Sequence, residues 1–127
     1  MTTTHANCPT QALQRLETLC LFAGAELPLQ AIRRQIANSI HLIVQQNRFS
    51  DGQRKVTAIS EVLGMRENGY GESIVELRPI FRAEKVGSAW EQRATGYAPS
   101  FLDALQRLEV EENDNEQNAD RATLDVD

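Results

Sequence analysis

The chain changes its hydrophobic period near residue 40, and this change is the strongest limit on what it can fold into. Before that point apolar residues recur every three or four positions. After it they form short runs rich in β-branched residues, separated by turn residues. Helices that precede strands, instead of alternating with them, are typical of an α+β arrangement. We therefore predict two helices, then antiparallel strands, and then a short C-terminal helix.

The first helix is expected to begin at Pro9 and to end before Gly24. Proline is favoured at the first helical position and glycine just past the last one. The residues between them carry an apolar stripe at helical spacing, which consists of Leu13, Leu16 and Cys20. Thr2-Thr3-Thr4, further upstream, predicts the end of a β-strand that leads into a polar turn at His5.

The second helix is expected to begin at Pro28. Its apolar stripe has the same spacing and consists of Leu29, Ile32, Ile36 and Ile40. Arg33 and Arg34 fall outside this stripe, so a solvated helix face explains both of them. Each buried Leu or Ile side chain contributes roughly 1.5–3 kcal/mol. Both stripes therefore need a sheet or another helix to cover them.

The first strands are predicted from one apolar run and one turn signal. Leu42-Ile43-Val44 is a continuous apolar run, which is typical of a strand buried on both faces. Asp51-Gly52 is a strong hairpin signal, and it predicts a second strand over residues 54–63. The glycines between 64 and 71 then predict a loop.

Three further elements are predicted downstream. Residues 74–78 alternate as a strand with Val75 and Leu77 facing inward, and Pro79 is expected to end it. Residues 90–95 are expected to add an edge strand. Residues 100–103 resemble a capping box that starts a short helix.

The acidic charge of the chain is concentrated at its C-terminal end. The net charge is −5, but residues 109–127 hold eight acids and one base, which leaves the preceding part with a net charge of +2. This tail has almost no large apolar residue except Leu124, so it cannot offset the entropy lost on ordering. We predict that residues 109–127 are disordered. A solvated tail is the simpler interpretation, and binding to a basic partner is the alternative.

Length and cysteine usage favour one domain in a reducing compartment. A chain of 127 residues is long enough for one modest core. Cys8 and Cys20 do not form a disulfide-rich framework, and no basic segment followed by an apolar one opens the chain. We therefore expect a cytoplasmic protein with two structural cysteines and no signal peptide.

Several short strings follow one another between residues 2 and 108. They are Thr4-His5-Ala6-Asn7, Arg15-Leu16-Glu17-Thr18, Leu27-Pro28-Leu29, Ala31-Ile32-Arg33, Leu42-Ile43-Val44-Gln45-Gln46 with Arg48, Asp51-Gly52 with Arg54, Ile59-Ser60-Glu61-Val62 with Gly64-Met65, Ile80-Phe81, and Thr95-Gly96-Tyr97-Ala98-Pro99. In this order the chain resembles the type II/type IV secretion ATPases, in particular the CpaF branch that powers Tad/Flp pilus assembly. Cys8, His41 and the stretch from Arg66 to Ser73 depart from the family pattern.

The resemblance implies a fold, an activity and partners. Residues 1–108 would be the C-terminal part of a RecA-like P-loop ATPase domain, which is of the α/β class when intact and α+β in this portion. The intact enzyme would be a homo-hexameric ring, cytoplasmic and peripheral to the inner membrane, that contacts platform proteins of the secretion or pilus machinery. Its ligands would be ATP and Mg²⁺, and hydrolysis would drive pilin assembly or secretion.

The phosphate-binding motif of such an enzyme does not occur in these 127 residues. Binding of a triphosphate uses the pattern G-x-x-x-x-G-K-[ST], in which backbone N–H groups, a lysine and a hydroxyl hold the phosphates and Mg²⁺. None of the seven glycines is followed by lysine. No apolar strand ending in Asp-Glu precedes the histidine segment either. We therefore expect the chain alone to bind no cofactor tightly and not to hydrolyse ATP.

His5 is the catalytic candidate. The resemblance implies a histidine near the phosphate end of the nucleotide, where it senses or supports hydrolysis. An imidazole can do this by hydrogen bonding to an acidic catalytic residue or to the γ-phosphate. Without the resemblance, a lone histidine is more often a turn or surface residue, and both interpretations stand at this point.

Other reactive side chains have simpler interpretations. His5 and Cys8 form an H-x-x-C pair, but a tetrahedral zinc site needs four ligands. The remaining candidates, Cys20 and His41, fall on a helix stripe and at a strand start, so no metal is predicted. Cys8 as a nucleophile lacks a third, orienting acid nearby in the sequence.

The arginines are candidates for binding anions. A guanidinium pairs bidentately with a phosphate or with a carboxylate of a neighbouring subunit. The candidates are Arg15, Arg33, Arg34, Arg48 and Arg54. Nucleic-acid binding is disfavoured, because the excess positive charge before residue 109 is small and aromatic residues do not interleave the bases.

Two functions from different classes fit these observations. The chain is either the C-terminal portion of a secretion ATPase or a non-catalytic interaction module. In the second case it would dock onto ring ATPases or onto membrane components of the secretion machinery.

Overall fold

A computed structural model describes residues 1–24 and 26–108 of the chain. The elements are α1 (Pro9–Phe22), α2 (Leu29–Ser39), β1 (Leu42–Arg48), β2 (Arg54–Glu67), β3 (Ser73–Val86) and β4 (Ala89–Ala94), and residues 102–108 form a further helix. By backbone contacts the chain divides into two units, Met1–Tyr97 and Ala98–Asp127. The predicted disorder of residues 109–127 lies outside the described residues.

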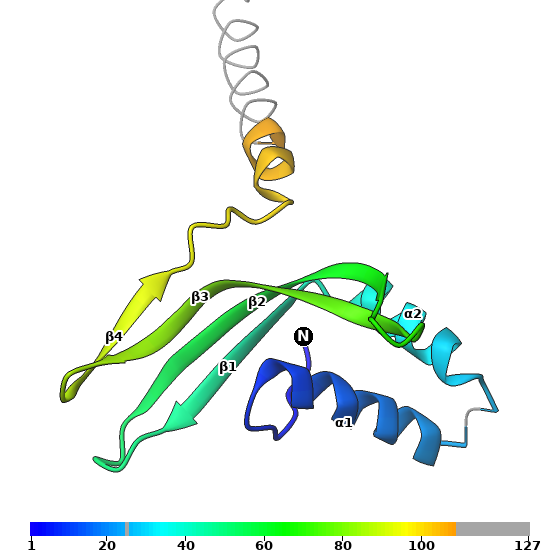
Figure 1. The fold of residues 1–127 in the computed structure, drawn as a ribbon, viewed down its shortest axis with the longest axis horizontal. Helices are drawn as coiled ribbons and strands as arrows, with labels where there is room; N and C mark the ends of the chain where they lie inside the picture. The colour runs from blue at the N-terminus through cyan, green and yellow to red at the C-terminus, as the bar shows by residue number, and fades with distance from the viewer. Residues whose placement is uncertain (25, 109–127) are drawn as a thin grey trace, which may run out of the picture. The chain divides into compact units, whose positions relative to one another are not determined.

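The first unit is a four-stranded antiparallel sheet with two helices. The strand order is β1-β2-β3-β4, so β1 and β4 are the edges. Both α1 and α2 lie against the same end of the sheet, and α2 packs on β2 and β3 (Figure 1). The predicted α+β arrangement, with helices followed by antiparallel strands, is confirmed.

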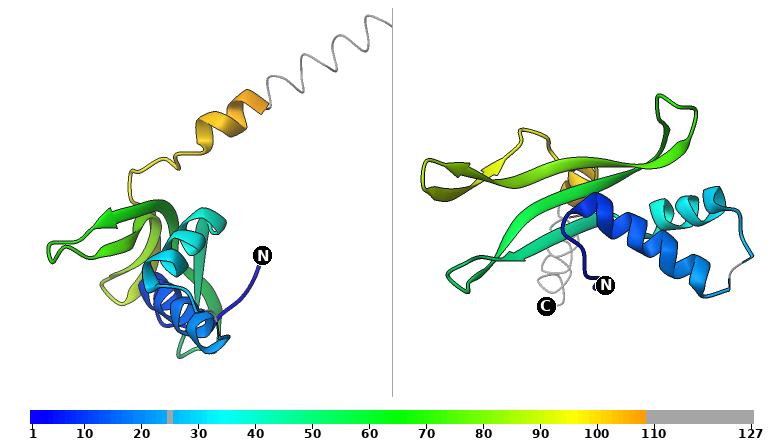
Figure 2. Two further views of the ribbon diagram at one scale, coloured as in Figure 1. Left: turned by 90° about the vertical axis from the view of Figure 1, so that its right-hand side faces the viewer. Right: turned by 60° about the horizontal axis from the view of Figure 1, so that its bottom comes forward.

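The helices bury most of the stripes that the sequence predicts, although Leu29 at the start of α2 is 37% exposed. Three side chains form the centre of the core, namely Leu13 of α1 and Ile32 and Ile36 of α2. Partly buried apolar residues pack around them: Leu16, Cys20, Ile40, Ile43, Val75 and Leu77. The inward orientation predicted for Val75 and Leu77 is therefore confirmed. Figure 2 shows from two further sides how the helices cover one end of the sheet.

The hairpin between β1 and β2 forms where Asp51-Gly52 predicts it. Phe49 N–H donates to Gln53 O over 2.8 Å, and Gly52 has a φ of +84°. Asp51 Oδ1 accepts a hydrogen bond from Gln53 N–H. A three-residue loop with glycine in the left-handed region is a common hairpin connection, so local chemistry alone determines this turn.

The predicted loop forms, but it lies between Glu67 and Ser73 and does not start at Gly64, and the predicted strand end at Pro79 is wrong. β2 continues through Gly64 to Glu67, and the backbone irregularity of the strand lies between Val62 and Gly64, where Gly64 has a φ of +119°. β3 continues through Pro79, which lies opposite a second irregularity. Proline is tolerated at such bulges, because no regular ladder hydrogen bond is lost there.

The prediction that the Leu42-Ile43-Val44 strand is buried on both faces is also wrong. β1 is an edge strand, and Leu42 and Val44 are 41% and 57% exposed. Ile43 instead packs against the core on the helix side. The two helices cover only one face of β1, so alternate side chains differ in burial.

The last predicted elements form close to their expected positions. β4 is an edge strand over Ala89–Ala94, and the helix at 102–108 begins within the predicted capping segment. Its first turn is held by hydrogen bonds from Leu102 N–H to Pro99 O and from Leu105 N–H to Phe101 O. Within the described part of the chain, no helix has the length and apolar character needed to cross a membrane.

Candidate functional site at the histidine turn

The histidine turn, residues 4–8, is attached to β1 and to α1 by hydrogen bonds. Gln45 of β1 donates from Nε2 to Ala6 O over 2.8 Å. Asn7 N–H donates to Gln11 Oε1 in the first turn of α1 over 3.3 Å. The turn therefore has a defined position beside the sheet although it belongs to no helix or strand.

The strand predicted at Thr2-Thr3-Thr4 does not form. Residues 1–6 have no regular secondary structure. A β-strand needs a ladder partner for its N–H and C=O groups. Within residues 1–24 and 26–108 no other strand pairs with this segment, so its β-branched residues stay in an irregular conformation.

His5 is exposed, and in the described residues its side chain makes no hydrogen bond or ion pair. The imidazole is therefore accessible and its neighbours are fixed by the Ala6 and Asn7 hydrogen bonds. This geometry is suited to a residue that contacts a ligand or a second polypeptide. The catalytic role of His5 stays a prediction.

The start of α1 shows why the histidine turn ends where it does. Pro9 is the first helical residue, and Cys8 is the N-cap with an extended backbone. The Cys8 side chain makes no capping hydrogen bond, whereas serine or aspartate at this position commonly does. Ala12 N–H donates to Cys8 O over 3.0 Å and closes the first turn.

The candidate metal ligands do not form a cluster. Cys20 packs against the core of the first unit, and His41 is exposed just before β1. Across the described ranges no group of three or more His, Cys, Asp or Glu side chains is arranged to hold a metal ion. Both cysteines are free thiols and half-buried.

Arg33 is not on a solvated helix face, and that prediction is wrong. Its Nε and Nη2 donate to the two carboxylate oxygens of Glu17, over 3.0 and 3.4 Å. Its Nη1 donates to Ser73 O over 2.8 Å and to Glu72 Oε1 over 3.4 Å. The Arg33 side chain is only 13% exposed. The hydrogen bond to Glu17, more than any other contact, raises the pKa of Arg33 above its ordinary value.

These contacts join three segments that are far apart in the sequence. Glu17 lies on α1, Arg33 on α2, and Glu72 with Ser73 at the turn that begins β3. Guanidinium pairs bidentately with carboxylate, which fixes orientation as well as charge. Arg33 therefore aligns the two helices with the sheet, and its acidic partners belong to its own chain.

Replacing Arg33 with alanine is expected to lower the free energy of unfolding by about 2–3 kcal/mol, because it leaves the Glu17 carboxylate half-buried without its guanidinium partner. Arg33→Lys should recover part of this loss, since an ammonium group keeps the positive charge but cannot pair bidentately with the carboxylate. Arg34→Ala, on the exposed side of the same helix, is the matched control and should change stability by less than about 0.5 kcal/mol. Urea unfolding followed by circular dichroism measures all three. Equal losses for Arg33→Ala and Arg34→Ala would contradict the role of Arg33.

The other candidate arginines are exposed. Arg15 lies on α1 and Arg34 on α2, both open to solvent. Arg48 and Arg54 are directly opposite each other at the hairpin end of β1 and β2. The five candidate arginines therefore differ in their surroundings. Arg33 is largely buried and paired with acids of its own chain. Arg15 and Arg34 are single surface cations, and Arg48 and Arg54 form a cross-strand pair.

Three polar residues are buried without having been predicted to be so, namely Gln45, Ser60 and Glu61. Gln45 faces the helix side of β1 and holds the histidine turn, and Glu61 of β2 is only 2% exposed. Glu61 is in register with Leu42 on one side and Arg78 on the other. A strict two-residue alternation from Ile43 would have marked Gln45 as a polar residue at an inward position. Nothing local marks Glu61.

A scan against protein-family models finds no match to the chain, and a search of curated proteins finds none either.

Proposed function

We propose that this chain is the C-terminal portion of a CpaF-type secretion ATPase domain, and that its sheet continues beyond β1 into the part of the domain that binds ATP. The observation that carries this proposal is the open edge of β1, with the histidine turn attached to that strand. The intact assembly would be a hexameric ring, peripheral to the inner membrane, that drives pilus assembly or secretion.

The two edges of the sheet differ in a way that favours continuation at β1. Residues 42–47 of β1 contain no charged side chain, and two of its apolar residues, Leu42 and Val44, are exposed. The β4 edge instead carries the Glu91–Arg93 ion pair, with Arg93 Nη2 2.8 Å from Glu91 Oε2. Proteins protect free sheet edges with charges, so the uncharged stretch of β1 before Arg48 is suited to pairing with another strand.

The position of His5 fits the same proposal. Gln45 connects β1 to Ala6, the residue that follows His5. A strand added beside β1 would therefore run past the histidine turn. In open α/β sheets, nucleotides bind at the carboxyl ends of strands. His5 would then lie within reach of a phosphate of the ATP molecule that the added part of the domain binds.

The proposal is tested by supplying the missing half in trans. The P-loop part of a CpaF-type ATPase, ending before the histidine segment, is co-expressed with the 127-residue chain. We expect the two to co-purify and to hydrolyse ATP together, whereas the chain alone shows neither turnover nor tight ATP binding. Hydrolysis is measured with a coupled phosphate-release assay, and ATP binding is measured on the protein recovered from gel filtration.

A lysine in the β1 edge provides the structural control. Val44→Lys should reduce co-purification at least tenfold, because a charge in an edge strand opposes pairing. Ala89→Lys, at the start of the opposite edge strand β4, should have little effect. If the P-loop part does not bind, or if both lysine variants bind equally well, the proposal is wrong. Binding without recovered hydrolysis would instead favour the non-catalytic interaction module.

A further inference from the structure

The β4 edge of the sheet carries two opposite charges on one face. Among the strands of the described residues β4 pairs with β3 alone, and all six of its residues are exposed. Glu91 and Arg93 are two positions apart, so their side chains lie on the same face of the sheet. They form an ion pair, with 2.8 Å between Arg93 Nη2 and Glu91 Oε2, and both side chains are about half exposed. A strand that runs in the opposite direction presents the same two charges in exchanged order.

Across the ladder to β3, each of these charges lies opposite its own sign. Arg93 is in register with Arg82, and Glu91 is in register with Glu84. Like charges directly opposite in a sheet are destabilising. The inner side of β4 therefore gives both residues an unfavourable neighbour. A favourable one can be added at the outer side, where no strand of the described part of the chain pairs.

The backbone of β4 is in the correct phase for such an addition. Thr95 N–H, just after β4, donates to Ile80 O of β3 over 2.9 Å. Hydrogen-bonded and non-hydrogen-bonded positions alternate along an antiparallel ladder. The N–H and C=O groups of Glu91 and Arg93 therefore point to β3. The groups at positions 90, 92 and 94 point to the free edge.

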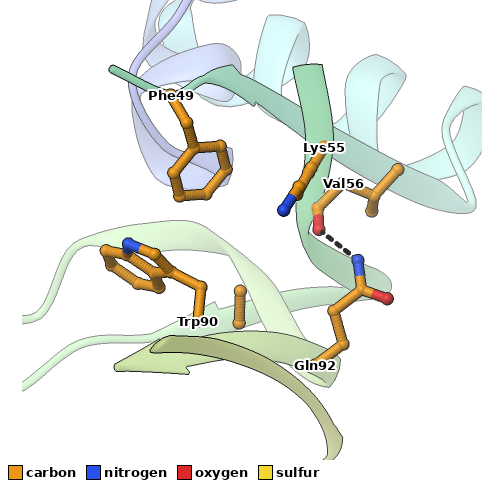
Figure 3. Close-up of a pocket in the computed structure, with 6 residues that line it drawn as sticks. Phe49, Lys55, Val56, Trp90 and Gln92 are labelled. Atoms are coloured by element: carbon orange, nitrogen blue, oxygen red, sulfur yellow. Dashed lines mark hydrogen bonds between the residues drawn. The ribbon is translucent and has the colours of Figure 1, made fainter. Parts of the chain in front are cut away.

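The other face of β4 is held in place by contacts with the first hairpin. Trp90 approaches Phe49 edge to face, with ring centroids 5.4 Å apart. Gln92 Nε2 donates to Val56 O over 3.1 Å (Figure 3). These contacts fix β4 through its side chains and leave its outward backbone groups available. The edge is thus a preformed template for another strand.

We propose that β4 pairs with β4 of a second copy of this chain, antiparallel and with the two-fold axis at Gln92. Each Glu91 then lies opposite the partner's Arg93. These are non-hydrogen-bonded positions of the new ladder, where side chains approach most closely. On the other face, Trp90 lies opposite the partner's Ala94, so a large side chain meets a small one. This inference does not depend on the proposed ATPase function, which concerns the β1 edge.

The charges select this register and this partner. Edge charges oppose pairing with most strands, because they are left beside apolar or like-charged neighbours. With the axis at Glu91 or at Arg93 instead, two like charges would lie opposite each other across the interface. Opposite charges across an interface favour one alignment, and like charges penalise the others. The β4 edge is therefore complementary to itself in one arrangement.

The oligomeric state of the full chain tests the proposal. A short edge buries little area, so we expect a reversible dimer that forms at roughly 10–100 μM and dissociates on dilution. Sedimentation equilibrium in low salt measures its dissociation constant. Raising the salt should weaken the dimer, because exposed ion pairs are screened. A chain that stays monomeric throughout this concentration range would overturn the proposal.

Charge exchange identifies the interface. Arg93→Glu and Glu91→Arg each make the two edge charges alike, and each should raise the dissociation constant of the homodimer at least about tenfold. An equimolar mixture of the two variants should dimerise again, because an acidic edge then lies against a basic one. The double variant Glu91→Arg/Arg93→Glu should dimerise like the parent, since its charges are still opposite. Failure of both the mixture and the double variant to dimerise would overturn the proposal.

Control variants separate this edge from the rest of the surface. Arg34→Glu on α2 makes the same change of charge as Arg93→Glu and should leave the dimer unchanged. Val44→Lys, in the opposite edge strand, should also leave it unchanged. If Val44→Lys dissociates the dimer and Arg93→Glu does not, the second copy binds at β1 and the proposal is wrong.

A proline variant tests the backbone pairing without a change of charge. Circular dichroism checks that every variant is folded. If a charge variant is unfolded, Ala94→Pro takes its place, because the N–H at this position points to the free edge and proline removes no hydrogen bond to β3. It should dissociate the dimer at least about tenfold more readily than the parent. An unchanged dimer in Ala94→Pro would exclude pairing through β4.

Discussion

Ile32→Ala is expected to remove much of the stability of the chain and to lower its unfolding midpoints in heat and in urea. Ile32 is 3% exposed and lies at the centre of the helix–sheet core. Truncation of a buried isoleucine to alanine costs about 2–5 kcal/mol, since both apolar burial and packing are lost. A domain of this size has a total stability of about 5–15 kcal/mol. Only four apolar residues of the described part are buried, namely Ala12, Leu13, Ile32 and Ile36. We therefore expect the stability of this chain to lie near the lower end of that range.

Leu29→Ala is the matched control for this prediction. It lies on the same helix and loses a similar number of carbons, but Leu29 is exposed. Its cost should stay below about 1 kcal/mol. Thermal and urea unfolding, followed by far-ultraviolet circular dichroism, compares the two variants with the parent chain. A loss for Ile32→Ala no greater than that for Leu29→Ala would show that this cluster does not determine stability.

The helices and the first hairpin could be predicted because their signals are local. Pro9, the apolar spacing and Asp51-Gly52 act within a few residues of the structure that they determine. The burial of Ile32 and Ile36 followed from the same spacing. Each of these features depends on backbone preferences and on one amphipathic stripe, which a single sequence contains.

The extent of the strands could not be predicted, because it depends on partners elsewhere in the chain. Gly64 and Pro79 disfavour a strand locally, yet both lie at bulges where the ladder is interrupted in any case. The exposure of Val44 is likewise a tertiary property. Its run of apolar residues does not reveal that the helices cover only one face of β1.

The candidate site was predictable only in part for a related reason. The position of His5 in a turn before α1 follows from Pro9. The Gln45 hydrogen bond that fixes this turn joins residues 39 positions apart, and the Arg33–Glu72 contact also spans 39. Local periodicity places Arg33 outside the apolar stripe but cannot show that acids from two other segments meet it there.

Fused behind the P-loop half of a CpaF-type ATPase, the chain is expected to recover ATP hydrolysis that depends on His5. His5→Ala should then lower kcat by roughly 10- to 1000-fold, the range for loss of one polar contact to a developing charge. The physical reason is that the imidazole would interact more strongly with the transferring phosphate in the transition state than in the ground state. Affinity for ATP should change little, because the P-loop backbone supplies it.

His41→Ala is the control for the fused enzyme, since it removes the other histidine, which is also exposed and lies just before β1. It should retain activity close to the parent fusion in the same steady-state assay. Parallel losses of nucleotide affinity and turnover in His5→Ala would mean that the histidine supports the fold and not the reaction. Full activity of the His5→Ala fusion would show that His5 takes no part in hydrolysis. A selective loss of kcat would place His5 at the phosphate, because only an interaction confined to the transition state lowers turnover and leaves binding unchanged.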